Sequence, residues 1–198
     1  MKFFILVLTL LFCITAYAAV PSACLRYRSD VLRYAHSING LNAPASMYLA
    51  QMEQESSCRV GIKASDGGEG VAQFMPNTAN DISRLYPQLG TPQPYNTAWA
   101  IPALIRFDTY LGQHVKGADD CQRRAAALKA YNAGPGYVQQ AQRKSPQPEI
   151  WFGVTEYVPT RQSAKNFEYS RLYPRWILLD RQPNYRLTGT YTCGNIKP

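Results

Sequence analysis

Four cysteines constrain the fold of this chain more than any other sequence feature. They follow the first 18 residues and are spread along the rest of the chain, at Cys24, Cys58, Cys121 and Cys193. An even number of cysteines in an exported protein predicts two disulfides, and the sequence leaves all three pairings open. Whatever the pairing, we expect Cys193 to hold the C-terminal tail against the body of the domain.

Free thiols and a metal site are weaker interpretations of the same cysteines. Four free thiols are unusual outside the cytoplasm. No two of the cysteines have C-x-x-C spacing, and only His36 and His114 are available to complete a set of metal ligands. We therefore expect no metal and no cofactor.

The first 18 residues predict that the chain is exported. Lys2 precedes an apolar run from Phe3 to Ile14, and Ala16-Tyr17-Ala18 has the small-x-small pattern of a signal-peptidase site. The run is shorter than the roughly 20 residues that span a bilayer, so an uncleaved anchor is the less favoured alternative. We expect a cleaved signal peptide over residues 1–18 that takes Cys13 with it. The mature chain, residues 19–198, would be one domain of the periplasm or cell envelope without a stable membrane span.

The composition predicts a globular domain with an anionic partner. Of 198 residues, 46% are hydrophobic and 17% are charged, which suits one core and argues against disorder. The formal net charge of +8 favours nucleic acid, acidic phospholipid or the acidic peptides of a bacterial cell wall. The basic residues are scattered, so charge alone does not choose among these partners.

Helical patterns dominate the chain. Apolar spacing and turn residues predict helices over residues 22–38, 43–58, 75–86, from 101 onward, 119–134 and 160–179. Residues 146–159 are rich in proline and aromatic residues and predict an irregular segment. Weak alternation over residues 183–198 favours a short C-terminal strand or hairpin. The predicted fold class is therefore mainly α.

Local signals predict where several of these helices begin and end. Asn42 is the expected N-cap of the helix over 43–58, and Pro44 is expected in its first turn. Pro102 is expected in the opening turn of the helix that begins near residue 101. Asp119 or Asp120 is expected to cap the next helix, which Gly134 would end.

The stretch "QMEQESSC", residues 51–58, places two glutamates on different sides of one predicted helix. Glu55 falls on the apolar face, whereas Glu53 falls at its edge and is expected to stay solvated. A carboxyl group in apolar surroundings resists ionisation, so Glu55 is a candidate proton donor near neutral pH. The ordinary alternative is that a glutamate at a helix end turns out to water.

Two further stretches carry candidate site residues. "GGEGVAQFMPNTA", residues 67–79, contains glycines that allow close backbone approach, followed by the amide of Gln73. "AYNAGPGYV", residues 130–138, places Tyr131 and Asn132 at a helix end. Taken singly, the first stretch has the alternative of an ordinary Gly-rich turn, and the second is better explained as a helix C-cap with a core tyrosine.

Together, "QESSC", "GVAQFMPNTA" and "AYNAGPG", in this order and at these separations, resemble the soluble lytic transglycosylases, whose helical fold is related to goose-type lysozyme. The resemblance covers residues 30–138 and continues more loosely over 139–177. It implies a lysozyme-like helical domain with Glu55 as the catalytic acid and base. It also implies that Ser56, Gln73, Tyr131 and Asn132 bind substrate.

The chain departs from the family pattern at three places. Val71 and Ala72 replace larger residues before Gln73, and Gly67-Gly68 replaces a Gly-Ala pair. The family has a later cleft tyrosine, and here "KNFEY" offers Phe167 at the matching place. Tyr169 stands two residues on, so the cleft position is open between Phe167 and Tyr169, and Tyr169 is our substrate-binding candidate.

The resemblance implies cleavage of the β-1,4 bond between N-acetylmuramic acid and N-acetylglucosamine in peptidoglycan. Glu55 would protonate the leaving oxygen and then take the proton of the 6-hydroxyl that attacks C1, giving a 1,6-anhydro product. The implied partner is the glycan strand and not nucleic acid. The setting stays open among wall remodelling, a secretion or conjugation apparatus, and phage lysis.

Alternative functions also follow from the sequence. A lysozyme-type hydrolase would use Asp66 or Glu69 to hold a water molecule. A non-catalytic wall-binding protein would keep the fold without turnover. A protein that acts on nucleic acid or membrane is supported by charge alone.

Overall fold

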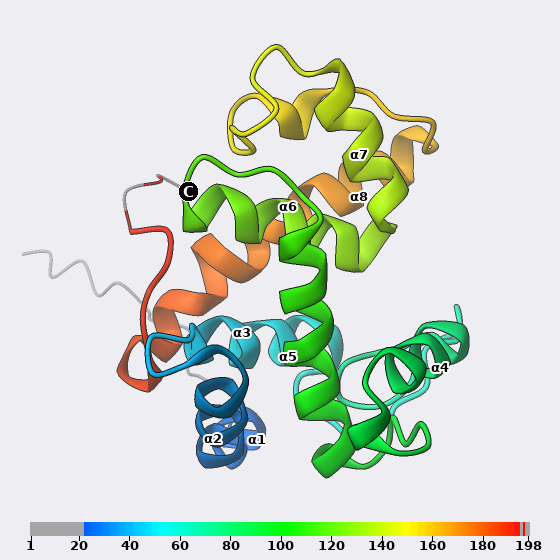
Figure 1. The fold of residues 1–198 in the computed structure, drawn as a ribbon, viewed down its shortest axis with the longest axis vertical. Helices are drawn as coiled ribbons and strands as arrows, with labels where there is room; N and C mark the ends of the chain where they lie inside the picture. The colour runs from blue at the N-terminus through cyan, green and yellow to red at the C-terminus, as the bar shows by residue number, and fades with distance from the viewer. Residues whose placement is uncertain (1–21, 195, 197–198) are drawn as a thin grey trace, which may run out of the picture.

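The computed structural model describes residues 22–194 and 196. The predicted signal peptide and Cys13 lie outside the described residues. Within them, the regular structure is helical, apart from isolated antiparallel bridges in the loop over residues 63–74. The helices within residues 22–85 form one part of the molecule, and those within residues 120–175 form the other (Figure 1). Helix α5 (Thr97–Gln113) reaches from one part to the other. None of the described helices is long and apolar enough to cross a membrane.

The α-helices are α1 (Ser22–Leu25), α2 (Arg28–Asn39), α3 (Ala45–Ser56), α4 (Pro76–Leu85), α5 (Thr97–Gln113), α6 (Asp120–Ala133), α7 (Pro135–Lys144) and α8 (Ala164–Arg175). Short 3-10 helices are η1 (Pro87–Leu89), η2 (Thr155–Tyr157) and η4 (Gln182–Thr188). The π-helical turn η3 (Trp176–Arg181) joins α8 to η4. These elements confirm the mainly α fold class.

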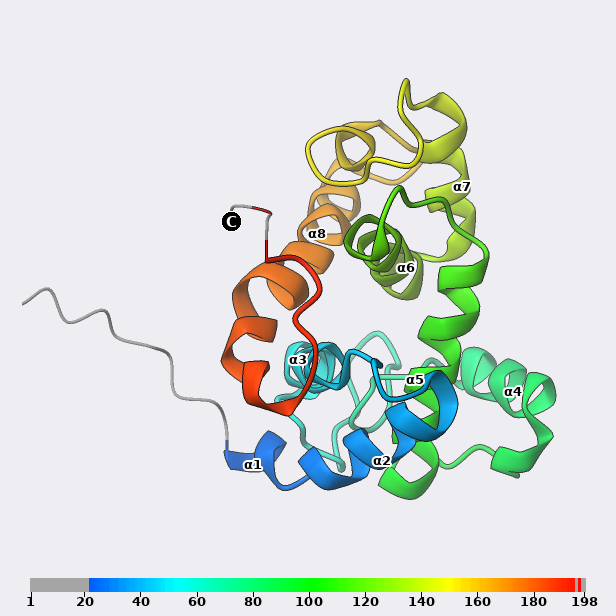
Figure 2. The same ribbon diagram turned by 60° about the vertical axis from the view of Figure 1, so that its left-hand side comes forward.

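Helix α3 lies in the centre of the molecule. Every residue from Ala45 to Met52 is buried, because α1, α2, η3 and η4 pack around the helix (Figure 2). A helix that is covered on all sides does not need a polar face. Glu53 follows this buried stretch, and its side chain is 17% exposed, so it is less solvated than the sequence predicts. The hydroxyl of Tyr185, in η4, donates to the carboxylate of Glu53 at 2.6 Å.

Several predicted helix boundaries shift by a few residues. The helix predicted over 22–38 is interrupted after α1 and resumes as α2. Asn42 does not cap α3, because Pro44 immediately precedes the helix. Asn96 caps α5 by accepting from the Ala98 amide at 3.0 Å, so Pro102 lies inside that helix and removes one of its backbone hydrogen bonds. The predictions for Asp119 and Gly134 at the two ends of α6 are confirmed.

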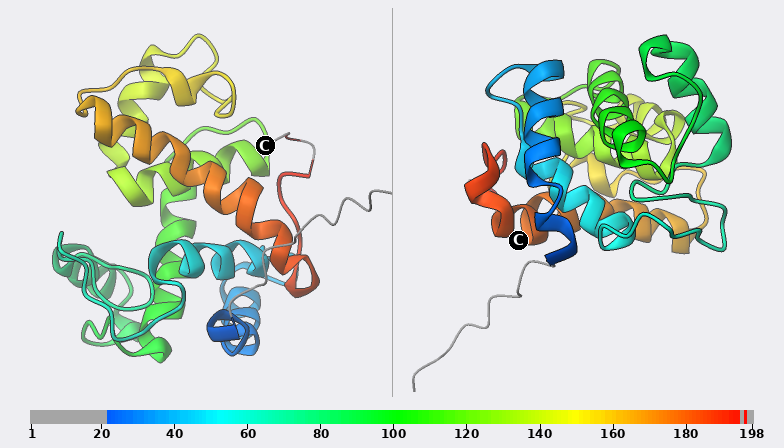
Figure 3. Two further views of the ribbon diagram at one scale, coloured as in Figure 1. Left: turned by 180° about the vertical axis from the view of Figure 1, so that it is seen from behind. Right: turned by 90° about the horizontal axis from the view of Figure 1, so that it is seen from below.

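The C-terminal tail contains no strand among its described residues, contrary to the sequence prediction. Helix α8 crosses α6 and leads through η3 into η4 beside α3 (Figure 3). A single strand leaves its backbone groups without partners unless another strand pairs with it. Here α3 supplies partners instead: Ser46 donates to the carbonyl of Thr190 at 2.9 Å and accepts from Gln182 Nε2 at 2.9 Å.

Two disulfides are present, as predicted. Cys24 pairs with Cys58, which ties α1 to the turn directly after α3. Cys121 pairs with Cys193, which ties the start of α6 to the tail and confirms the expected role of Cys193. Each bridge therefore secures a segment that packs against α3.

Candidate active site

Glu55 lies in the last turn of α3, directly before a sharp reversal of the chain. Ser57 and Cys58 adopt left-handed backbone conformations with φ of 52° and 59°. Although part of Glu55 remains accessible to solvent, protein packs closely around its carboxyl group, and this burial raises its pKa to about 8. The negative charge of Asp66 raises it further, whereas a hydrogen bond from Tyr173 lowers it. Glu55 therefore holds a proton at neutral pH.

Tyr173 belongs to the candidate site, although the sequence did not lead us to predict it. Its hydroxyl, carried by α8, donates a hydrogen bond to the carboxyl of Glu55, and the side chain is buried. Burial raises the pKa of the Tyr173 phenol well above its usual value, and the neighbouring Glu55 adds to the shift. The sequence held a usable signal, because Tyr169 and Tyr173 are four residues apart and share one face of a helix.

The two residues of α8 that the sequence offered for the later cleft position, Phe167 and Tyr169, make different contacts from Tyr173. Tyr169 is 52% exposed, and its ring meets that of Trp176 edge to face at 5.1 Å. Burial of part of its surface and the charge of Glu55 raise the pKa of Tyr169. Phe167 faces the ammonium of Lys129, which lies 5.2 Å from the ring centre. Tyr169 lines the same pocket as Asn132, and Phe167 is not part of that lining.

Tyr131 lies between the end of α6 and the Gly-rich loop. Its hydroxyl donates to the carbonyl of Ala72 at 2.7 Å, and its ring packs against Phe74 and Phe107. Burial raises its pKa well above the usual tyrosine value, with a further contribution from the charge of Glu55. Tyr131 thus stays protonated and ties the loop to α6.

Ser56 and Gln73 bind backbone groups of the same loop. The buried hydroxyl of Ser56 donates to the carbonyl of Val71 at 2.9 Å. Gln73 has φ of 50° and donates through Nε2 to the carbonyl of Gly70 at 2.8 Å. A Cβ atom at Gly70 would lie 1.8 Å from the carbonyl oxygen of Pro94, so only glycine fits there. These contacts fix the loop against the end of α3.

Asn132 and Tyr169 line a pocket of about 400 Å³ whose wall is mainly polar. Asp66, Arg161 and Asn166 contribute to the same wall. Glu55 does not line it, but its charge acts on Tyr169, and the charge of Asp66 acts on Glu55. The pocket therefore adjoins the proton donor and offers amide, carboxylate, guanidinium and phenol groups to a polar ligand.

The two acids of the hydrolase alternative differ in their surroundings. Glu69 pairs with Lys63 at 2.9 Å, and this hydrogen bond lowers the pKa of the Glu69 carboxyl. Asp66 accepts from the Gly68 amide at 3.2 Å and faces the pocket that contains Asn132. Of the two, Asp66 is the one placed near the candidate site.

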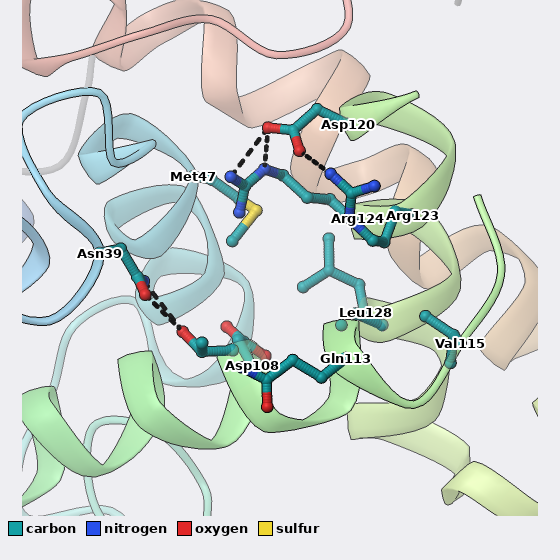
Figure 4. Close-up of a pocket in the computed structure, with 12 residues that line it drawn as sticks. Asn39, Met47, Asp108, Gln113, Val115, Asp120, Arg123, Arg124 and Leu128 are labelled. Carbon is teal, nitrogen blue, oxygen red and sulfur yellow. Dashed lines mark hydrogen bonds and ion pairs between the residues drawn. The ribbon is translucent and has the colours of Figure 1, made fainter. Parts of the chain in front are cut away.

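A second cavity of about 520 Å³ contains none of the predicted site residues (Figure 4). It lies among α2, α3, α5 and α6. In the described part of the chain, no cluster of three or more His, Cys, Asp or Glu side chains is arranged to hold a metal ion.

Comparisons with known proteins agree on the fold. The family model for the transglycosylase SLT domain matches residues 31–152. An inactive glutamate-to-glutamine variant of the lytic transglycosylase Slt from Pseudomonas aeruginosa aligns with a TM-score of 0.60, 22% identity and coverage of 84% of this chain and 25% of that one. The 70 kDa soluble lytic transglycosylase from Escherichia coli aligns with a TM-score of 0.51 and 24% identity. This alignment covers 80% of this chain and 25% of the Escherichia coli chain. The chain thus spans about a quarter of the length of each. A search of curated protein sequences finds no match.

Proposed function

Because the chain belongs to the transglycosylase SLT domain family, we propose that it is a lytic transglycosylase that cleaves the glycan strands of peptidoglycan. The observation that carries the proposal is the state of Glu55. Burial keeps its carboxyl protonated at neutral pH, and the group adjoins a polar pocket. A protonated carboxyl group beside such a pocket is what breaking a glycosidic bond requires.

Glu55 acts twice in the proposed reaction. It first donates its proton to the oxygen that links N-acetylmuramic acid to N-acetylglucosamine, and the bond from C1 to that oxygen breaks. The resulting carboxylate then takes the proton of the muramic acid 6-hydroxyl as that oxygen bonds to C1. The 1,6-anhydro ring closes, no water is consumed, and Glu55 ends the cycle protonated.

The neighbouring side chains suit separate tasks in this reaction. Tyr173 donates to the carboxyl of Glu55 and so stabilises the carboxylate that forms after proton donation. Asn132 presents an amide in the pocket, where it would orient the substrate's N-acetyl group, and Tyr169 offers a ring face at the same wall. The hydrogen bonds of Ser56, Gln73 and Tyr131 hold the Gly-rich loop in place. These three residues would therefore contribute to substrate binding through the position of this loop.

An extracytoplasmic site of action accords with the covalent structure and charge. Two disulfides persist in oxidising compartments. The net charge of +8 attracts the chain to a wall that carries acidic peptides. We therefore propose cleavage of the signal peptide after residue 18 and action of residues 19–198 in the periplasm or cell envelope.

The test is digestion of purified peptidoglycan with residues 19–198, produced under oxidising conditions, and with the Glu55→Gln variant. We expect muropeptide masses that carry anhydro-muramyl ends, formed at least about 100-fold more slowly by the variant. Because Gln cannot ionise, the variant should be at least as stable as the parent at neutral pH, which separates lost chemistry from lost folding.

Asp66→Asn and Glu69→Gln are the matched controls. Under the proposed mechanism both keep anhydro products, and Glu69→Gln keeps nearly the full rate. Hydrated reducing ends that depend on Asp66 would establish the hydrolase alternative instead. An active Glu55→Gln variant would remove Glu55 from the chemistry.

A further inference from the structure

The cavity of about 520 Å³ is separate from the candidate active site and has two chemically different sides. It shares no lining residue with the pocket that contains Asn132. Asp108, on α5, lies on one side, and Asp120 with Arg123 and Arg124, on α6, lies on the other (Figure 4). The apolar side chains of Met47 and Leu128 lie between them.

Asp108 places an unsatisfied acceptor at this cavity. The residue is 6% exposed, and within the described part of the chain its Oδ1 accepts a single, long hydrogen bond of 3.4 Å from Nε2 of Gln51. Its Oδ2 is buried and has no hydrogen-bond partner among the described residues. The Oε1 atom of Gln51 is likewise without a donor. The proton that Asp108 holds at neutral pH supplies one donor at this end of the cavity. Once that proton leaves, the buried carboxylate needs donors in its place, so ionised Asp108 calls for a ligand group rich in N–H donors.

The opposite side of the cavity carries surplus positive charge. Asp120 accepts from Arg123 and, at 3.1 and 2.9 Å, from Nε and Nη2 of Arg124. Two guanidinium groups therefore share one carboxylate. Nη1 of Arg124 donates to no acceptor within the described part of the chain, so it is available to a further anionic oxygen.

We propose that this cavity binds an amino acid with a distal ammonium group, whose ammonium is held by Asp108, whose carboxylate is held by Arg124 and whose alkyl chain lies along Met47 and Leu128. This chemistry is that of the diamino acid in peptidoglycan peptide stems and of the free amino acid. We assign the site to the stem, an assignment that rests on the proposed function. The cavity would then bind the peptide while the pocket beside Glu55 binds the sugar.

Binding should exchange a proton for the ammonium group. Burial raises the pKa of the Asp108 carboxyl to about 8, so Asp108 itself is uncharged at pH 7 when the cavity is empty. Besides burial and the hydrogen bond from Gln51, the charge of Arg124 lowers the pKa of Asp108 and that of Glu55 raises it. The Asp108 charge in turn raises the pKa values of three nearby tyrosines, Tyr48 on α3, Tyr131 on α6 and Tyr173 on α8. An ammonium stabilises the carboxylate, so binding below pH 8 releases the Asp108 proton to solvent. Affinity should therefore rise about tenfold from pH 6 to pH 7.

The first experiment is calorimetric titration of the folded chain with 6-aminohexanoate, in two buffers of different ionisation heat. We expect saturable binding with release of close to one proton at pH 6. Hexanoate, which lacks the ammonium, and hexylamine, which lacks the carboxylate, should each bind at least tenfold more weakly. Equal binding of all three, or no saturable binding, would overturn the inference.

Variants test each end of the site. Asp108→Asn keeps the size of the side chain and should lower affinity for 6-aminohexanoate at least tenfold and abolish proton release. Arg124→Gln should remove the advantage of 6-aminohexanoate over hexylamine. Glu149→Gln, which removes an exposed carboxylate outside the cavity, should leave binding unchanged. Unaltered binding by folded Asp108→Asn and Arg124→Gln would contradict the assignment.

Two further ligands distinguish a peptide stem from a free amino acid as the natural ligand of the cavity. A muramyl tripeptide that ends in meso-diaminopimelate should bind at least as tightly as free meso-diaminopimelate, and the reverse order would overturn the stem assignment. Glu55→Gln separates this inference from the proposed function, because it should bind the tripeptide without cleaving glycan. Cleavage without tripeptide binding would refute the cavity site alone, and binding by a parent protein that does not cleave would refute the proposed function alone.

Discussion

At the scale of single residues, Glu55 and Tyr173 form a pair in which each controls the protonation of the other. The hydrogen bond from Tyr173 opposes the effect of burial on Glu55, and Glu55 in turn helps to keep the phenol protonated. A donor acid needs a pKa near the working pH, and this bond holds the Glu55 pKa at about 8 instead of higher.

Replacing Tyr173 tests this balance. Activity that depends on protonated Glu55 should fall as pH rises through about 8. Tyr173→Phe removes the bond that lowers the Glu55 pKa, so the alkaline limb of the pH–rate profile should move to higher pH. The maximal rate should fall about tenfold or more, because the carboxylate loses a donor. If the alkaline limb stayed at the same pH, the hydrogen bond from Tyr173 would not control the pKa of Glu55.

At the scale of elements, α8 carries Tyr169 and Tyr173 and is held in place by Glu156. The Glu156 side chain has no exposed surface and accepts two hydrogen bonds from Arg175, at 2.9 and 2.7 Å. It also accepts from the Gly153 amide at 2.6 Å. The irregular segment over residues 146–159 thereby anchors the helix that reaches Glu55.

The Glu156→Gln variant should lose this anchor. Removing one partner of a buried ion pair leaves the other charge uncompensated, which costs about 3–5 kcal/mol. Glu168→Gln is the matched control, because Glu168 pairs with Arg171 while 55% exposed, and exposed ion pairs contribute little to stability. Urea denaturation of both variants measures the difference. Equal losses would show that the Glu156 pair does not secure α8.

At the scale of the whole molecule, each of the two disulfides secures a segment that packs on α3. Cys24–Cys58 spans 34 residues and Cys121–Cys193 spans 72. The first fixes the turn that follows Glu55, and the second keeps the tail against the helix that carries Glu55. Both bridges therefore stabilise the packing that raises the Glu55 pKa.

Removing the longer bridge should destabilise the fold without changing the reaction. Chain-entropy arguments assign about 4 kcal/mol to a loop of this length, so Cys121→Ser with Cys193→Ser should lower the free energy of unfolding by a comparable amount. Reduction of the parent chain, which opens both bridges, should cost more. A reduced parent as stable as the oxidised one would contradict this role for the bridges.

The sequence by itself determined the features that local patterns encode. Apolar spacing placed most helices to within a few residues and put Glu55 on a buried face, and cap residues marked both ends of α6. The cysteine count predicted two bridges. Each of these depends on backbone preference, helical period or residue count over a short stretch.

Only the tertiary structure decided which distant groups meet. Tyr173 reaches Glu55 across 118 residues, and Tyr185 reaches Glu53 across 132. Two differences from the sequence prediction have the same cause, which is that the tail packs on α3. This packing gives Glu53 a hydrogen-bond partner and places the helical turn η4 where a strand was predicted. Which groups pack together depends on the balance of burial and hydrogen bonding over the whole chain, and no periodic pattern within one segment contains that information.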